Sequence, residues 1–315
     1  MKKIKVLLTT LMILGSYSQT QAQLTSSNKD PEEAKIVYDD ILNFIDAFKM
    51  LKSSTDTLEV LQKYYIDKGT PGLKIYIEKY ELDASSLTKA IRKNPEDYKA
   101  LGERLTWLKS QEDSIRFYFH KLKRFIPKAV FPPTYYLVGQ RWGVGSGSIE
   151  GQLITIEKKA IDVVDPGIKT HIIHELVHLN QLQSIGSLKK YLAIYNDEKS
   201  LLAISLREGV AEFFADLITG EYTQNEAREY VLKNEREIWD RFQTDMLNTD
   251  TKDWMWKSPK NTEQPRDIGY VFGALIIEYY YKHATNLDQA VQEILAITDY
   301  KDFLEMSQYS NRFNN

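Results

Sequence analysis

A single segment, DPGIKTHIIHELVHLNQ (residues 165–181), holds three of the five histidines of this chain, at positions 171, 174 and 178. Asp165 and Pro166 predict the start of a helix, because aspartate is a good N-cap and proline suits the first helical turn. Apolar residues at positions 172, 173, 176, 177 and 179 give that helix a wide apolar face. The segment therefore predicts a buried helix with polar side chains facing a cleft.

His174, Glu175 and His178 form the pattern HExxH within this helix. Residues four apart on a helix face the same way about 6 Å apart along the axis, so both imidazoles can reach one zinc ion at roughly 2.0–2.1 Å. Glu175 is turned about 100° from His174, which suits it to accept a proton from water at the metal. The alternative is a helix with satisfied core histidines, but two histidines flanking a buried glutamate are costly without a metal.

His171 lies on the same helical stripe as the two predicted ligands. It is seven residues from His178, about 10.5 Å of helix rise, which is too far for one ion that also binds His174. We therefore predict that His171 lines the cleft or lies behind the metal ligands, or has an ordinary capping or core role.

A catalytic zinc ion needs a third protein ligand and an open position for water. The segment LREGVAEFFAD (residues 206–216) predicts a second helix that ends at Gly220. Glu208 is the predicted third ligand, and Glu212, one turn later, is predicted to accept a hydrogen bond from a zinc-bound histidine. Gly209 costs about 1 kcal/mol of helix propensity, which suits close packing against the histidine helix. The alternative makes both glutamates solvated surface charges.

These residues resemble the gluzincin metallopeptidases, in which a histidine helix is followed by a glutamate-bearing helix. The pattern EGxAEF (Glu208 to Phe213) and the later GYxxG (Gly269 to Gly273) are most similar to a family of bacterial predicted zinc-dependent proteases. The resemblance covers roughly residues 130–285 and implies a zincin-like catalytic domain. One departure is Glu212, since thermolysin-type enzymes carry aspartate four residues after the third ligand.

Residues 268–281 predict a further buried helix that is too short to span a membrane. Tyr270 and Arg266 lie near its start, and either could donate a hydrogen bond to a developing oxyanion. Trp254 and Trp256, in the loop before it, could line a substrate subsite. The alternatives are that Tyr270 only packs and that the tryptophans cover a core.

The N-terminus is typical of an export signal, with three lysines before an apolar run from Val6 to Gly15. We expect cleavage after Ala22, a periplasmic or secreted protein, and no stable membrane anchor. The chain has no cysteine, so it contains neither a disulfide nor a lipid-modified cysteine. Loss of residues 1–22 takes the formal charge from −3 to −6, and with no run of one sign the sequence gives no hint of nucleic-acid binding.

The chain is 43% apolar, as in an ordinary globular protein, and long enough for one large domain or two modest ones. After the signal peptide (1–22), residues 23–126 predict a helical region, with helices near 30–51, 55–67, 83–93 and 96–125. Residues 127–315 predict the zincin-like domain. Segments 134–138 and 152–157 predict strands around a glycine-rich loop. The resemblance to the metallopeptidases implies a sheet whose edge could hold an extended peptide, and the alternative is a plain hairpin with no ligand role.

The expected fold is α+β and helix-rich, with a small sheet beside an N-terminal helical region. The expected activity is hydrolysis of a peptide or protein substrate by Zn²⁺ with Glu175 as general base. The alternatives are an exported peptide- or envelope-binding protein with a structural or vestigial zinc site, and hydrolysis of a non-peptide amide. The sequence leaves the oligomeric state open.

Overall fold

The computed structural model describes residues 28–52, 55–140, 145–148, 150–157, 167–256 and 263–313, without the side chain of Asp197. The predicted signal peptide and the predicted helix cap at Asp165 and Pro166 lie outside these residues. The described chain is helix-rich with one small mixed sheet, which confirms the predicted α+β class. No helix within the described ranges is long and apolar enough to cross a membrane.

The chain divides into two compact units. Unit 1 comprises residues 1–120 and 128–179, and unit 2 comprises residues 121–127 and 180–315. The N-terminal helices thus share a unit with the sheet and with most of the histidine helix. The predicted boundary at residue 127 stays a prediction.

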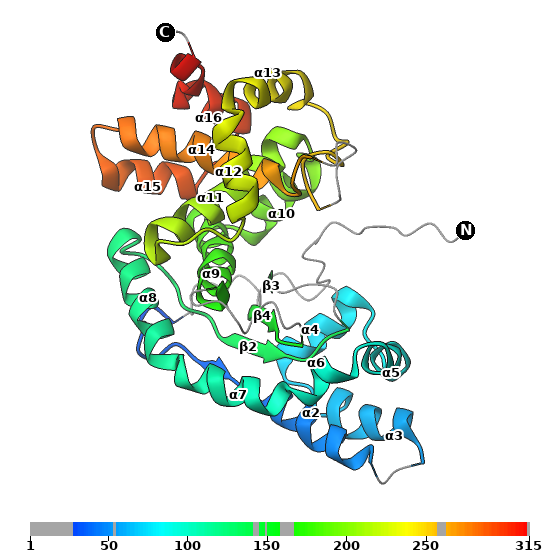
Figure 1. Ribbon diagram of the computed structural model, residues 1–315. Helices are drawn as coiled ribbons and strands as arrows, with labels where there is room; N and C mark the ends of the chain where they lie inside the picture. Colours follow the sequence, from blue (N-terminus) through cyan, green and yellow to red (C-terminus); the bar gives the residue numbers. More distant parts are fainter. Residues whose placement is uncertain are drawn as a thin grey trace. The chain divides into compact units, whose positions relative to one another are not determined.

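Unit 1 opens with short helices (Figure 1). They are α2 (Asp39–Met50), α3 (Thr57–Leu61), the π-helix η1 (Gln62–Ile66), α4 (Pro71–Tyr80), α5 (Ala84–Lys93), α6 (Pro95–Lys99), α7 (Leu101–Ser110) and α8 (Glu112–Phe125), whose residues from 121 onward belong to unit 2. The first helix begins later than predicted because Ile36–Val37 pairs with the sheet as β1. The single helix expected over 96–125 is three helices, with breaks at Ala100 and Gln111.

Aromatic side chains join these helices to the sheet. Phe44 packs edge-on against Tyr65, with ring centroids 5.2 Å apart, and lies 5.8 Å from Tyr98. The hydroxyl of Tyr65 donates to the carbonyl of Val138 at 2.6 Å, and that of Tyr98 donates to Gly139 at 3.0 Å. Each buried tyrosine therefore satisfies its polar group at the end of a strand.

The sheet has the strand order β1-β2-β4-β3. Its other strands are β2 (Thr134–Leu137), β3 (Gly145–Ser148) and β4 (Gly151–Thr155). Strands β2 and β4 run parallel, so the predicted hairpin between them is wrong. Strand β3, of sequence GSGS, pairs antiparallel with β4 and forms an edge. It was not predicted because glycine and serine have low strand propensity, and pairing with β4 outweighs it.

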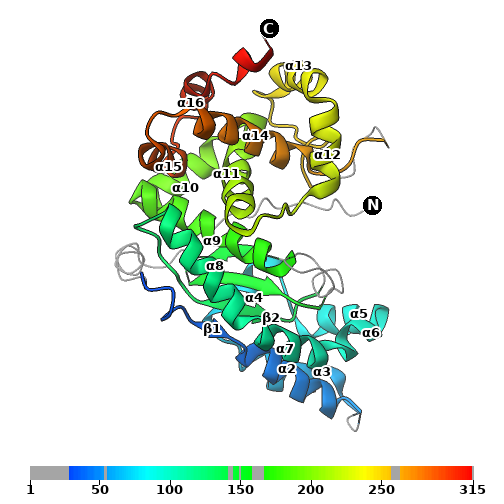
Figure 2. The same ribbon diagram turned by 60° about the vertical axis from the view of Figure 1, so that its left-hand side comes forward.

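Helix α9 (Gly167–Ile185) carries the histidines and continues from unit 1 into unit 2. The helices of unit 2 (Figures 1 and 2) are α10 (Leu188–Asp197), α11 (Leu201–Thr219), α12 (Asn225–Lys233), α13 (Glu235–Asp245), α14 (Ile268–His283), α15 (Leu287–Leu295), α16 (Tyr300–Ser307) and the 3₁₀ helix η3 (Tyr309–Phe313). Gly220 ends α11 in the left-handed conformation at φ 79°, as predicted.

Helices α11 and α14 cross with their backbones in contact. A Cβ atom on Gly209 would overlap the backbone of Gly273, and a Cβ atom on Gly273 would overlap the backbone carbonyl of Ser205. The sequence prediction that Gly209 packs against the histidine helix is therefore wrong, because its partner is α14. Glycine at both positions is required by this close approach.

Gly273→Ala is expected to lower the free energy of unfolding by about 1–3 kcal/mol or more, because the added methyl must separate two packed helices. Chemical denaturation of the full chain measures the change. The control is Gly102→Ala in α7, where a Cβ atom meets nothing within 4 Å. That control should be neutral or stabilising by up to about 1 kcal/mol. Equal effects of the two substitutions would contradict the close crossing.

Candidate metal centre

Helix α9 presents His174 and His178 one turn apart. Their ring centroids are 4.9 Å apart and the rings are nearly perpendicular, at 82°. His174 is 7% exposed and His178 is half-buried. Ile172, Ile173, Leu176 and Val177 are at most 1% exposed, so the apolar face predicted for this helix is buried and fixes its orientation.

Glu208 on α11 completes a group of three possible ligands. One ligand atom from each of His174, His178 and Glu208 lies within 4.8 Å of the other two. Two imidazole nitrogens and a carboxylate oxygen suit zinc and other divalent transition metals. Ligand atoms about 2.0–2.1 Å from a tetrahedral ion lie roughly 3.4 Å apart, so shifts of about an ångström would close the group. These three predicted residues are thus brought together and could bind a metal ion, whose identity stays open.

His171 is half-buried on α9 and does not belong to this group of described residues. This placement agrees with the prediction that His171 is too far from His178 to share one ion that also binds His174. Along the same helix, Gln181 follows His178 by three residues and donates to the backbone carbonyl of Arg207 at 3.4 Å. This bond ties the end of α9 to α11 at the residue before Glu208.

Glu175 is half-buried beside the backbone of the edge strand β3. A Cβ atom on Gly145 would lie 2.8 Å from the Oε1 atom of Glu175, and one on Gly147 would lie 3.9 Å from Oε2. The glycines of β3 therefore leave room for this carboxylate. Sequence reasoning noted these glycines but did not connect them with Glu175, because their pairing depends on the tertiary fold.

Glu212 lies one turn after Glu208 and is 4% exposed. Its carboxylate accepts a short hydrogen bond from the hydroxyl of Thr223, in the loop after α11. Thr223 was not found from the sequence, since a threonine in a loop carries no local signal of such a contact. The predicted hydrogen bond from a histidine to Glu212 stays a prediction.

Tyr270 lies near Glu208 at the start of α14. Burial, and next the negative charge of Glu208, raise the pKa of Tyr270 well above its ordinary value, so the hydroxyl keeps its proton. The indole Nε1 of Trp256 donates to this hydroxyl at 2.7 Å.

Trp256 is held by its neighbours in an unusual conformation. It has φ 57°, and Asp267 has φ 62°; left-handed residues of this kind each cost about 1–3 kcal/mol. The backbone N–H of Trp256 donates to the Asp267 carboxylate, and its carbonyl accepts from exposed Arg266 at 2.8 Å. Burial raises the pKa of Asp267. Arg266 thus anchors this loop, while Trp256 directly contacts Tyr270.

Trp254 lies in the core of unit 2 with 2% of its surface exposed. Its Nε1 donates to Asp245 at 3.0 Å, and its ring packs against Phe242 at 5.4 Å and under the Arg241 guanidinium at 4.3 Å. This position favours the packing alternative for Trp254 over the substrate subsite.

Zinc is expected to bind the full chain at one site and to raise its unfolding temperature, because a ligand of the folded state stabilises it. Glu208→Ala should weaken zinc binding by more than about a hundredfold, because it removes a ligand. Glu212→Gln should weaken zinc binding by only about ten- to a hundredfold, the range typical of residues that hydrogen-bond the ligands. Isothermal titration with zinc measures both. Wild-type affinity in Glu208→Ala would remove Glu208 from the site.

No family model matches the sequence, and no curated protein or solved structure matches it significantly. The resemblance to gluzincins therefore rests on the motif residues and on the arrangement of His174, His178 and Glu208.

Proposed function

We propose that this protein is an exported zinc-dependent peptidase of the gluzincin type, with a zincin-like catalytic domain. The observation that carries the proposal is the convergence of His174, His178 and Glu208 within 4.8 Å, with Glu175 on the next helical position. Within the described residues the group has three protein ligands, which leaves a coordination position for water or substrate. A closed structural site would have a fourth.

A bound zinc ion would supply a Lewis acid at these three ligand atoms. Glu175 would accept the proton of the attacking water and then transfer it to the leaving amine. Tyr270 keeps its proton and lies near Glu208, so its hydroxyl would donate to the oxygen that becomes negative. Trp256 would hold that hydroxyl in place through its 2.7 Å hydrogen bond.

The edge strand β3 would position the substrate. Its second edge is not paired with a described strand, and Gly145 and Gly147 present backbone without side chains beside Glu175. An extended peptide can add to such an edge through main-chain hydrogen bonds. A peptide so bound would have its backbone next to the proposed general base, which favours a peptide over a compact amide as substrate.

Glu175→Gln is expected to lower hydrolysis of a quenched fluorescent peptide mixture by about 10²–10⁴-fold, because the amide cannot accept the proton. Zinc content should not change, since the three ligands remain. Glu226→Gln, an exposed change on α12, is the matched control and should leave the rate unaltered. A Glu175→Gln variant as active as this control would exclude the proposed mechanism. Zinc binding without cleavage by any form would favour the binding-protein alternative.

Gly145→Ala tests the room around Glu175 independently. The new methyl would lie 2.8 Å from the Glu175 carboxylate oxygen and displace it, so kcat should fall at least about tenfold with zinc affinity unchanged. Gly102→Ala in α7 is the control, because a Cβ atom there meets nothing within 4 Å and the residue lies outside strand β3. Equal kcat values in the two variants would contradict the contact between β3 and the general base.

A further inference from the structure

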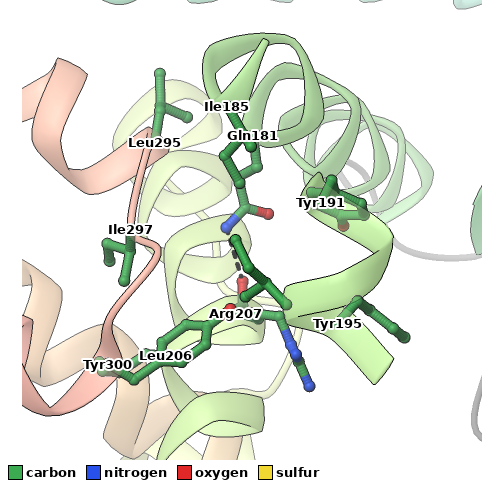
Figure 3. A pocket seen from close by; sticks show the side chains of 10 residues that line it. Gln181, Ile185, Tyr191, Tyr195, Leu206, Arg207, Leu295, Ile297 and Tyr300 are labelled. Carbon is green, nitrogen blue, oxygen red and sulfur yellow. Dashed lines mark hydrogen bonds between the residues drawn. The ribbon is translucent and has the colours of Figure 1, made fainter. Parts of the chain in front are cut away.

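A pocket in unit 2 has a buried positive charge that the proposed peptidase mechanism does not use. It is lined by Arg207, Gln181, three tyrosines and five aliphatic side chains, with about 310 Å³ of unfilled space including the open solvent at its mouth (Figure 3). The tyrosines are Tyr191, Tyr195 and Tyr300.

Arg207 is 6% exposed and has no carboxylate partner among the described residues. Its Nη1 donates to the backbone carbonyl of Glu198 at 3.1 Å, and it also hydrogen-bonds the Tyr300 hydroxyl. The carboxylate of Glu198 accepts from the backbone N–H of Ser200 at 3.1 Å. A guanidinium has five N–H donors, so these contacts leave donor capacity for a ligand.

The guanidinium lies between two aromatic rings. Its central carbon is 4.4 Å from the ring centroid of Tyr195 and 5.7 Å from that of Tyr300, and Figure 3 shows the side chain running between them. Arg228 in the same unit is also stacked, 3.7 Å above Tyr222, but it pairs with Glu278 at 3.5 Å. Of these two stacked arginines, Arg228 pairs with a carboxylate and Arg207, within the described ranges, does not.

A buried cation without a counter-ion is unfavourable, and an anion entering the pocket would relieve this cost. Burial raises the pKa of Tyr191 and of Tyr300, so both hydroxyls stay protonated and can donate. The planar guanidinium matches the two oxygens of a carboxylate. A doubly charged phosphate would be poorly matched by one arginine against an aliphatic wall.

We propose that this pocket binds a carboxylate with an apolar substituent, through Arg207 and the tyrosine hydroxyls. The carboxylate can come from two sources, the C-terminus of a peptide or a free short-chain acid. The site does not depend on a bound metal. None of the three proposed metal ligands lines the pocket.

The test is calorimetric titration of the full chain with N-acetyl-leucine and with N-acetyl-leucinamide, which lacks the charge. The acid should bind at least about tenfold more tightly than the amide, equally with zinc and after chelation, since a carboxylate could otherwise bind the metal itself. The proposal would be overturned if both compounds bound equally or if the acid bound only in the presence of zinc. It would also be overturned if chloride competed with the acid at similar concentrations.

Variants identify the residues. Arg207→Met should abolish binding of the acid, whereas Arg228→Met, its stacked counterpart, should leave it unchanged. Tyr191→Phe, which keeps the ring, should weaken binding of the acid severalfold. This variant provides the test if circular dichroism shows that Arg207→Met does not fold. Unchanged affinity in Tyr191→Phe and in folded Arg207→Met would assign both residues to packing alone.

Two peptides that end in leucine, one with a free and one with an amidated C-terminus, distinguish the two sources of the carboxylate. If the free peptide competes with N-acetyl-leucine for the pocket at similar concentrations, the pocket binds peptide C-termini. Competition by the short acid alone assigns it to small carboxylic acids. Either result supports a carboxylate site, and failure of both ligands to bind rejects it whether or not the protein is a peptidase.

Discussion

The crossing of α11 and α14 is the contact on which the residues that unit 2 contributes to the candidate site depend. Gly209 and Gly273 let the two backbones touch, and the chemically important residues stand beside these glycines. Glu208 precedes Gly209, and Tyr270 is three residues before Gly273, almost one turn along α14. The glycines in the two motifs therefore have a physical reason: they bring a carboxylate on one helix close to a phenol on the next.

That closeness concentrates negative charge. Burial is the main cause of the raised pKa of Tyr270 and of the raised pKa of Asp267, and the negative charges of Glu208 and Glu212 add to both. The hydroxyl of Thr223 donates a hydrogen bond to the Glu212 carboxylate. A divalent cation near Glu208 would balance part of this charge, and histidines, which are neutral ligands, would add none. The electrostatics of unit 2 thus agree with the donor set.

Local sequence patterns explain why the three ligands and strands β2 and β4 were predictable and the edge strand β3 was not. His174, His178 and Glu208 lie on helices whose apolar residues recur at the helical period, so their directions followed from spacing alone. Strand β3 consists of glycine and serine, and its pairing with β4 depends on residues outside it. Trp254 shows the same limit: its sequence context indicates a loop, but Phe242 and Arg241 from a separate helix enclose it.

Arg207 and Glu208 show how one helix can serve two sites of opposite charge. Successive helical residues point about 100° apart, so these neighbours do not face each other. Glu208 faces the histidines, whereas Arg207 faces Tyr195 and Tyr300. Had Arg207 been one turn from Glu208, the two would favour an ion pair, and the carboxylate would be a weaker metal ligand. Their adjacency keeps the carboxylate available to a cation and the guanidinium available to an anion.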